Sequence, residues 1–235
     1  DVDELSLALA MDDKVLKDIF GNLYYPESPY EFSVLSADIL GQVYERFLGK
    51  VIRLTAGHQA KVEEKPEVRK AGGVYYTPDF ITKEIVRQTI GDQIEGKTPK
   101  QVAKLRFCDM ACGSGSFLIA AFQSLIDWHR DYYVKDSPEK HSKILYRSGD
   151  DWRLATDEKK RILLNNIYGA DIDSQAVEVT KLSLLLKVLE GESQESLTKQ
   201  FELFHERALP DLGRNIQCGN SLIGTDILEG DLFEK

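Results

Sequence analysis

One stretch of the chain constrains its fold more than any other. Phe107 and Cys108 lead into a turn over residues 109–116, with glycines at positions 113 and 115, and an apolar segment over residues 118–128 follows. This order predicts a buried strand, a tight turn and a helix. Such a turn directs backbone N–H groups and the positive end of a helix at one point, and its glycines let a ligand approach the backbone closely.

The glycine spacing bears on which ligand the turn would hold. Dinucleotide sites use the pattern G-x-G-x-x-G, and S-adenosylmethionine sites use a related turn. Gly113 and Gly115 fit the dinucleotide pattern, but Leu118 occupies its third glycine position. A nicotinamide-dependent oxidoreductase therefore stays open as an alternative, with Leu118 against it.

The composition is that of an ordinary globular protein and excludes several classes. Hydrophobic residues make up 42% of the 235 residues, but no apolar run approaches the ~20 residues that span a membrane. The first residues lack the pattern of a secretory signal. The net charge of −9 argues against a surface largely devoted to nucleic acid, so any DNA contact would come from a small patch or from another part of the protein.

The cysteines and histidines give no sign of a disulfide framework or a metal site. The three cysteines form no C-x-x-C pair and the four histidines show no ligand spacing, so we expect no metal. Cys108 and Cys218 lie in apolar, strand-like sequence and are expected in the core, whereas Cys112 is expected to pack within the glycine turn. Because this cysteine pattern gives no disulfide framework, we expect the protein in a reducing cytoplasm.

The hydrophobic pattern changes near residue 71. Residues 1–71 show apolar residues at helical spacing, most clearly over residues 34–48, and the charged segment 56–71 is expected to be a linker. From residue 72 onward strands alternate with helices, which predicts an α/β fold with a doubly wound parallel sheet, preceded by an α-helical N-terminal region. The expected strands cover residues 105–110, 166–173 and 215–220, and residues 136–157 are expected to form a surface excursion.

A helix is also expected just after the point where the pattern changes. Thr77 is its expected N-cap and Pro78 its first residue, because threonine caps helices and proline is tolerated in the first turn. Its inner face is expected to carry Ile81, Ile85, Val86 and Ile90.

Polar residues follow each predicted strand, and parallel strands end at one edge of a sheet, where ligands bind. The turn from Asp109 to Ser116 offers backbone groups to the methionyl and carboxylate side of a ligand, and Asp171 offers acceptors to ribose hydroxyls. Asn220 can read the edge of an adenine ring, with Ile172 and Leu222 on the two faces of the ring.

Each of these residues also has a simpler interpretation. Asp109 alone fits a helix cap, Asp171 and Asp173 fit N-caps for the helix that starts at Ser174, and Asn220 fits an ordinary turn. Their occurrence together, in order and after successive strands, favours a binding site.

Four segments resemble successive motifs of one enzyme family, the gamma-type adenine-N6 DNA methyltransferases of restriction–modification systems. They are residues 73–78 (GVYYTP), 109–117 (DMACGSGSF), 168–173 (YGADID) and 218–224 (CGNSLIG). In that family, too, a Tyr-Thr-Pro motif precedes the glycine turn, although Met110 stands where the family usually has proline. Residues 40–48 resemble the helical connector of large single-chain restriction–modification enzymes.

The resemblance implies a Rossmann-like class I methyltransferase domain over residues 72–235, a helical connector over residues 1–71 and S-adenosylmethionine as cofactor. It implies double-stranded DNA as a partner, with restriction or specificity modules in the same or another chain. The residues implied at the cofactor are Tyr76, Thr77 and Pro78 over the methionine moiety, Asp109, Ala111, Cys112, Gly113, Ser114 and Gly115 at its amino and carboxylate groups, Asp171 at the ribose, and Ile172, Asn220 and Leu222 at the adenine.

The family's catalytic loop, Asn/Asp-Pro-Pro-aromatic, is not found in the sequence. The nearest match, Ser28-Pro29-Tyr30, lacks the second proline. We therefore expect a methyltransferase domain truncated before its catalytic loop, with no catalytic residue of its own and no methylation by this chain alone. Methyltransferases of RNA, protein or small molecules stay open, as does a degenerate fold serving as a non-catalytic DNA-binding or assembly subunit, which the intact Asp171 and glycine turn disfavour.

Overall fold

The structure is a computed structural model that describes residues 12–23, 27, 39, 41, 43–44, 50–55, 57, 59–64, 77–191 and 209–223. The chain divides into two compact units, Asp1–Ser36 and Ala37–Lys235. The described part of the first unit holds helix α2 (Asp13–Gly21), whose first turn is capped by the Asp12 carboxylate, which accepts the Lys14 N–H at 2.8 Å. Tyr76 lies outside the described residues.

The N-terminal part of the second unit is not helical throughout. Its residues 39, 41, 43 and 44 are helical, in agreement with the predicted helix. Strands β1 (Lys50–Leu54) and β2 (Ala60–Glu64), however, pair in an antiparallel hairpin where a helical region and a charged linker are expected. The β-branched residues of this segment favour strands, and the surrounding charges hide their pattern.

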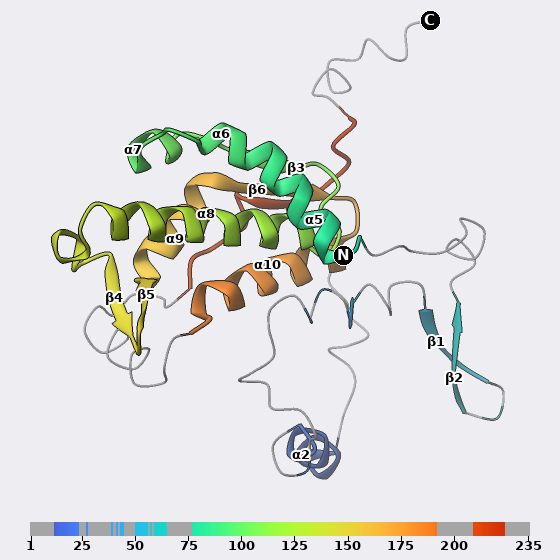
Figure 1. Cartoon of the computed structure of the whole chain (residues 1–235). Helices are drawn as coiled ribbons and strands as arrows, with labels where there is room; N and C mark the ends of the chain where they lie inside the picture. The colour runs from blue at the N-terminus through green and yellow to red at the C-terminus, as the bar shows by residue number, and fades with distance from the viewer. Residues whose placement is uncertain are drawn as a thin grey trace, which may run out of the picture. The chain divides into compact units, whose positions relative to one another are not determined.

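A parallel sheet forms the centre of the second unit, as the alternation of elements predicts. Its strands are β3 (Phe107–Asp109), β6 (Ile167–Asp171) and β7 (Ile216–Cys218), in the order β3–β6–β7. The register places Asp109 beside Gly169 and Asp171 beside Cys218. The carboxyl ends of all three strands therefore reach the same edge of the sheet (Figure 1).

Three helices connect and cover these strands: α8 (Ser116–Lys135), α9 (Thr156–Asn166) and α10 (Ser174–Leu189). Their apolar faces meet the sheet in one core, in which Phe122, Leu125, Ile162, Ile167 and Leu184 are completely buried. Burial of such side chains contributes about 1.5–3 kcal/mol each, so this core holds the strand ends in place. Among the described residues, no helix has both the length and the apolar character to cross a membrane.

The helix expected after residue 77 is present but begins later. The four short elements of this region are α5 (Asp79–Val86), the π-helical turn η2 (Arg87–Gly91), α6 (Asp92–Ile94) and α7 (Pro99–Val102). The prediction of Thr77 as N-cap is wrong: Pro78 occupies that position in an extended conformation, with no side-chain cap. Val86 and Ile90 are buried as expected, whereas Ile81 and Ile85 are exposed.

The expected surface excursion contains a second hairpin. It follows the short 3₁₀ helix η3 (Pro138–His141) and consists of β4 (Leu145–Ser148) and β5 (Asp151–Leu154). Leu145 and Leu154 pair directly across it and are both buried. The hairpin is therefore part of the core next to α8, because its alternating side chains place one apolar row inward.

Two buried asparagines tie the amino-terminal side of the sheet together. The Nδ2 group of Asn166 donates to the carbonyls of Val102 and Leu105, both at 2.7 Å, and so joins the start of β6 to the segment that leads into β3. Asn215 precedes β7, and its Nδ2 group donates to the carbonyl of Ile167 at 2.8 Å. Both residues act at the opposite edge from the predicted site, and they fix the strands relative to one another.

Candidate functional site

The turn between β3 and α8 is held by hydrogen bonds within the protein. The Asp109 carboxylate accepts the Ala111 N–H at 3.0 Å, and the Cys112 N–H donates to the Ala170 carbonyl on β6 at 3.0 Å. Asp109 thus closes a local turn and is not the cap of α8, whose N-cap is Gly115. The turn is ordered by the sheet itself.

The two glycines of the turn are required by the backbone. Gly113 and Gly115 both have positive φ angles, 53° and 88°. At Gly115 a Cβ atom would lie 2.8 Å from the side chain of Thr180 on α10, whereas at Gly113 it would meet no atom of the described residues within 4 Å. The Thr180 hydroxyl in turn donates to the Gly113 carbonyl at 2.8 Å. Gly115 allows the close approach of α10, and Gly113 leaves space beside the backbone among the described residues.

Asp171 connects the strand ends. Its Oδ2 accepts the Gly113 N–H at 2.8 Å, its Oδ1 accepts the Asp173 N–H at 2.9 Å, and its carbonyl accepts the Gly219 N–H at 2.9 Å. Of the two simpler interpretations, Asp173 is indeed the N-cap of α10, with Oδ1 accepting the Gln175 N–H at 2.9 Å, but Asp171 is not a cap. A carboxylate has about four acceptor positions, so Asp171 retains capacity for a ligand hydroxyl.

The loop after β7 completes the arrangement. The Ser221 hydroxyl donates to the Met110 carbonyl at 2.7 Å, which joins this loop to the first one. Asn220 Oδ1 accepts the Leu222 N–H at 3.0 Å, so the simple turn interpretation also holds for Asn220. Ile172 and Leu222 are 74% and 89% exposed, which is unusual for side chains of their size and leaves them accessible to a ligand.

Tyr44 is a residue of this region that sequence reasoning missed. Its hydroxyl donates to Asp173 Oδ2 at 3.3 Å. Burial, together with the nearby Asp173 carboxylate, raises the pKa of Tyr44 to about 12, so the hydroxyl remains a donor at neutral pH. The two residues are 129 positions apart, and no local pattern signals such a contact.

The cysteines differ from expectation in two of three positions. Cys112 is buried in the turn, and burial, reinforced by the charge of Asp109, raises the pKa of its thiol to about 12. The thiol is therefore protonated, in agreement with the predicted packing role. The prediction that Cys108 and Cys218 are core residues is wrong, because the short strands β3 and β7 leave these positions exposed.

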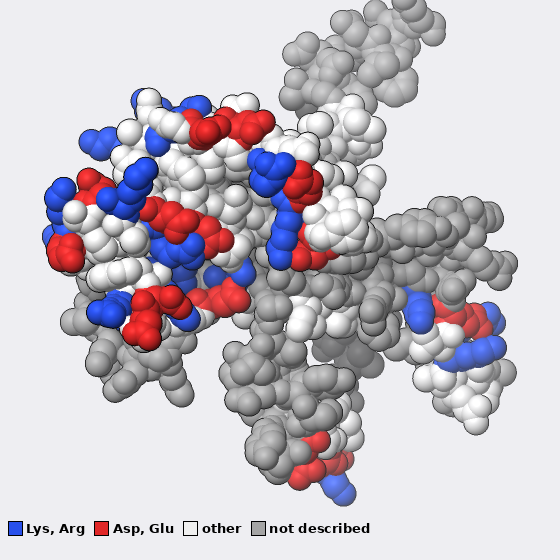
Figure 2. Space-filling model, in the orientation of Figure 1, with Lys and Arg blue, Asp and Glu red and all other residues white. Residues whose placement is uncertain are grey.

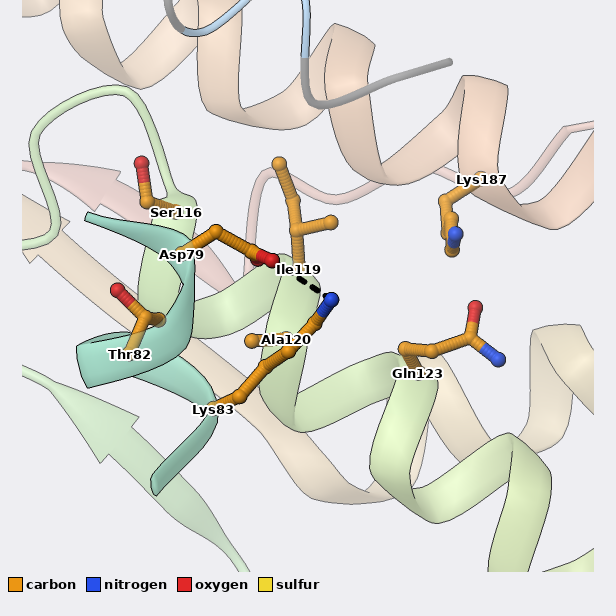
Figure 3. Close-up of a pocket in the computed structure, with 8 residues that line it drawn as sticks. All are labelled: Asp79, Thr82, Lys83, Ser116, Ile119, Ala120, Gln123 and Lys187. Atoms are coloured by element: carbon orange, nitrogen blue, oxygen red, sulfur yellow. Dashed lines mark ion pairs between the residues drawn. The ribbon is translucent and has the colours of Figure 1, made fainter. Parts of the chain in front are cut away.

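A small cleft adjoins the turn on the side of α5. It has a volume of about 180 Å³, lies between α5, α8 and α10, and includes Ser116 (Figure 3). Its basic side chains are paired with acids of the same chain: Lys83 Nζ lies 2.6 Å from Asp79 Oδ2, and Lys187 Nζ lies 2.5 Å from Glu190 Oε2. The cleft is thus not built for an anion.

A larger cavity, of about 760 Å³, lies along β3 and was not indicated by the sequence. Among the described residues β3 pairs only with β6, and the cavity occupies the region beside β3, η2 and α8. It is lined largely by apolar side chains, including Val86, Ile90 and Phe117, and it shares Asp109 and Met110 with the turn. An apolar hollow therefore extends from the predicted site along the sheet.

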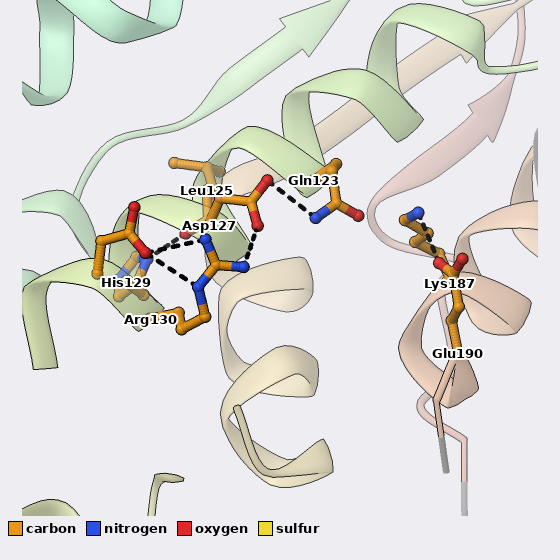
Figure 4. A network of polar contacts seen from close by, with 8 residues as sticks. Gln123, Leu125, Asp127, His129, Arg130, Lys187 and Glu190 are labelled. Atoms are coloured by element: carbon orange, nitrogen blue, oxygen red, sulfur yellow. Dashed lines mark hydrogen bonds and ion pairs between the residues drawn. The ribbon is translucent and has the colours of Figure 1, made fainter. Parts of the chain in front are cut away.

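Charges on the face that Figure 2 displays are mixed. Figure 2 shows Lys and Arg side chains interspersed with Asp and Glu over the face it displays. Along α8, Asp127 Oδ1 lies 2.7 Å from Arg130 and its Oδ2 accepts the Gln123 amide at 3.0 Å (Figure 4). Paired charges of this kind do not make the basic stripe typical of a nucleic-acid surface.

Comparison with known proteins places this geometry in context. Residues 91–226 match the family described as MmeI, DNA-methyltransferase domain. The chain is 38% identical over 234 residues to the type II restriction enzyme and methyltransferase RM.Eco57I of Escherichia coli, covering 99% of the chain and 22% of that protein. It is 33% identical over 227 residues to the putative type II restriction enzyme and methyltransferase RM.MjaORFECS2P of Methanocaldococcus jannaschii, covering 81% of the chain and 17% of that protein.

A more distant relative is the adenine-specific methyltransferase BrxX of Escherichia coli O9:H4. The identity is 23% over 212 residues, covering 76% of the chain and 15% of that protein. The chain thus spans about a fifth of the length of these relatives.

Proposed function

Because the chain belongs to the MmeI family of DNA-methyltransferase domains, we propose that it forms the S-adenosylmethionine-binding part of an adenine-N6 DNA methyltransferase in a restriction–modification system. The names of its relatives support both halves of this proposal, restriction and adenine-specific methylation. The observation that supports this proposal most directly is that hydrogen bonds of Asp171 and Ser221 join the loops after β3, β6 and β7. The fold would be a Rossmann-like class I methyltransferase domain over residues 72–235.

The residues at the strand ends suit this cofactor. Open space beside Gly113 would admit its methionine end to the backbone, and the half-buried Asp171 carboxylate would accept the ribose hydroxyls. The exposed side chains of Ile172 and Leu222 would cover the adenine faces, with the Asn220 amide at its edge. Tyr76, Thr77 and Pro78 would close over the methionine moiety.

When bound, S-adenosylmethionine supplies an electrophilic methyl group on its sulfonium. The protein's own contribution is to fix the orientation of the donor, since well-aligned reactants gain much of their rate from positioning. Loops already held by hydrogen bonds, such as that of Gly113 to Asp171, lose little further freedom when the cofactor binds.

DNA would be the methyl acceptor of the complete protein, with restriction or specificity modules as its partners. The net charge of −9 and the mixed charges of the described surface support a DNA contact made mainly by other parts of that protein. The sequence has no Pro-Pro pair, so the catalytic loop typical of adenine methyltransferases would also come from elsewhere. We therefore expect no DNA methylation by the 235-residue chain alone.

Calorimetric titration tests the proposal. The purified chain should bind S-adenosylmethionine and not NAD, and Asp171→Asn should weaken the binding at least tenfold. Asp136→Asn is a matched control, because it removes the same charge from an exposed acid that lies 3.0 Å from His141 Nε2. Urea denaturation of each variant separates lost binding from lost folding. A folded chain that binds NAD, or neither ligand, would contradict the proposal.

A further inference from the structure

A helical segment outside the predicted site lies directly against it. Gly41 is buried, and a Cβ atom at this position would lie 3.3 Å from Ser114 Oγ and 3.5 Å from the Ser114 carbonyl oxygen. Tyr44, three residues later, donates its hydroxyl to Asp173 Oδ2. Residues three apart share one face of a helix, so a single helical face contacts both the glycine turn and the loop after β6.

These contacts lead to the centre of the site by a short path. Tyr44 binds the Asp173 carboxylate, the Asp173 N–H binds Asp171 Oδ1, and Asp171 Oδ2 binds the Gly113 N–H. The two carboxylates and the backbone amide between them thus form a continuous network. The hydroxyl of Tyr44 therefore joins the helical segment to the Asp173 side of this network.

We infer that the helical segment carrying Gly41 and Tyr44 is a positioning element of the cofactor site, with Tyr44 as a positioning residue for the loop from Asp171 to Asp173. Gly41 provides the close approach, because any larger residue would press on Ser114. Binding of the cofactor would then be coupled to the placement of this segment, which precedes the methyltransferase fold in the chain. The inference rests on the proposed function.

The test compares two tyrosines of the same chain. Tyr44→Phe removes the hydroxyl that binds Asp173, and Tyr133→Phe removes one that donates to Glu158 Oε1 at 3.0 Å, near the other end of α8. Both variants lose a tyrosine–carboxylate hydrogen bond, but only the first lies beside the site. We expect Tyr44→Phe to weaken S-adenosylmethionine binding about fivefold, the effect of one hydrogen bond of ordinary strength, and Tyr133→Phe to leave the affinity unchanged.

A second variant and a ligand-free measurement keep the test decisive. Gly41→Val should also weaken binding while the Tyr44 hydroxyl remains. Amide hydrogen exchange of the unliganded chain should become faster at Gly113 in Tyr44→Phe and not in Tyr133→Phe.

If the wild-type chain binds the cofactor and Tyr44→Phe binds it equally well, or if both tyrosine variants weaken it alike, the inference is overturned and the proposed function stands. If the wild-type chain binds no cofactor, the proposed function fails. The inference then fails as well, because it rests on that function. Where the wild-type chain does bind the cofactor, unchanged hydrogen exchange at Gly113 in Tyr44→Phe overturns the inference alone.

Discussion

Asp171 Oδ2 accepts the backbone N–H of Gly113 at 2.8 Å, across 58 residues of sequence. The contact joins the end of β6 to the glycine turn after β3, so the acid proposed to bind the cofactor ribose also shapes the loop proposed to hold the methionine end. A variant of Asp171 therefore changes stability and binding together. The two effects have to be measured side by side.

Asp171→Ala should lower the free energy of unfolding by about 2–4 kcal/mol, because two backbone N–H groups lose a charged acceptor. Asp171→Asn keeps one acceptor oxygen and should cost about 1–2 kcal/mol. Urea denaturation followed by circular dichroism gives both values. An alanine variant as stable as wild type would show that the bonds to Gly113 and Asp173 do not hold the turn.

Gly115→Ala should be more destabilising than Gly113→Ala. Both positions have positive φ, which costs a residue with a Cβ atom about 1–2 kcal/mol, but only at Gly115 would the Cβ atom also collide with Thr180. We expect about 1 kcal/mol at Gly113 and at least about 2 kcal/mol more at Gly115.

Measuring the same two glycine variants in a Thr180→Ala background tests whether the contact with Thr180 causes the difference between them. Two atoms of the Thr180 side chain that lie 2.8 Å from the added Cβ are absent there, so the difference between the two alanine variants should shrink. A difference that persists in full would assign the cost to the backbone conformation instead.

Most of the α/β part of the fold is predictable because its signals are local. The glycine turn after β3 and the apolar stretch of α10 behind Asp173 each specify their structure within about ten residues. The order of polar residues after the strands also indicates one shared edge, and the hydrogen bonds of Asp171 and Ser221 show the three loops in contact.

What escapes prediction depends on partners far along the chain. Tyr44 has no feature that distinguishes it from other helical tyrosines until Asp173 is beside it. Thr77 is a good N-cap by type, but the extended Pro78 takes that position. Cys108 belongs to a strand, as predicted, yet its side chain is exposed. The local sequence pattern does not indicate which face of a strand or helix will be covered by an element from elsewhere in the chain.

Asn166 provides a test at the opposite edge of the sheet. Its Nδ2 group serves two buried carbonyls, so Asn166→Ala should lower the free energy of unfolding by about 2–3 kcal/mol. Asn166→Asp should be worse than alanine at pH 7, because a carboxylate offers no proton to the Val102 and Leu105 carbonyls and is costly to bury. Its deficit should decrease as the pH is lowered and the acid becomes protonated. Denaturant unfolding of the variant and of the wild type at pH 5 and pH 7 measures this, and a deficit relative to the wild type that is the same at both pH values would refute the role.

His129 should make the stability depend on pH. The ring is completely buried, its Nδ1 lies 2.8 Å from the Leu125 carbonyl, and its Nε2 has no hydrogen-bond partner in the described part of the chain (Figure 4). Burial lowers the pKa of His129 below its ordinary 6.5, an effect only partly offset by the bond to Leu125. Below pH 6.5 the unfolded chain therefore binds a proton that the folded chain does not, and stability falls as the pH decreases toward the folded-state pKa.

The slope of this loss approaches about 1.4 kcal/mol per pH unit and should disappear in His129→Gln. Glu158 affects the stability in a different pH range. Burial opposes its ionisation, but the interaction with Arg161 outweighs this effect and holds the pKa of Glu158 below 4.5. The stability that Glu158 contributes is therefore lost only at a more acid pH than the loss caused by His129. Chemical denaturation from pH 8 to pH 5 isolates the histidine. An unchanged slope in His129→Gln would assign the loss to another group.

The hydrogen bonds that close the candidate site also set when it can form during folding. They join residues 58 positions apart at Gly113 and Asp171, and 111 apart at Met110 and Ser221. Contacts of such separation carry a loop-closure entropy cost, and we expect them to form after the intervening strands have assembled. A partly folded chain in which β7 has not joined the sheet would have the glycine turn but not the loop after β7 beside it. A molecule that needs all three loops therefore recognises only chains that have completed their sheet, and its binding reports on folding as well as on chemistry.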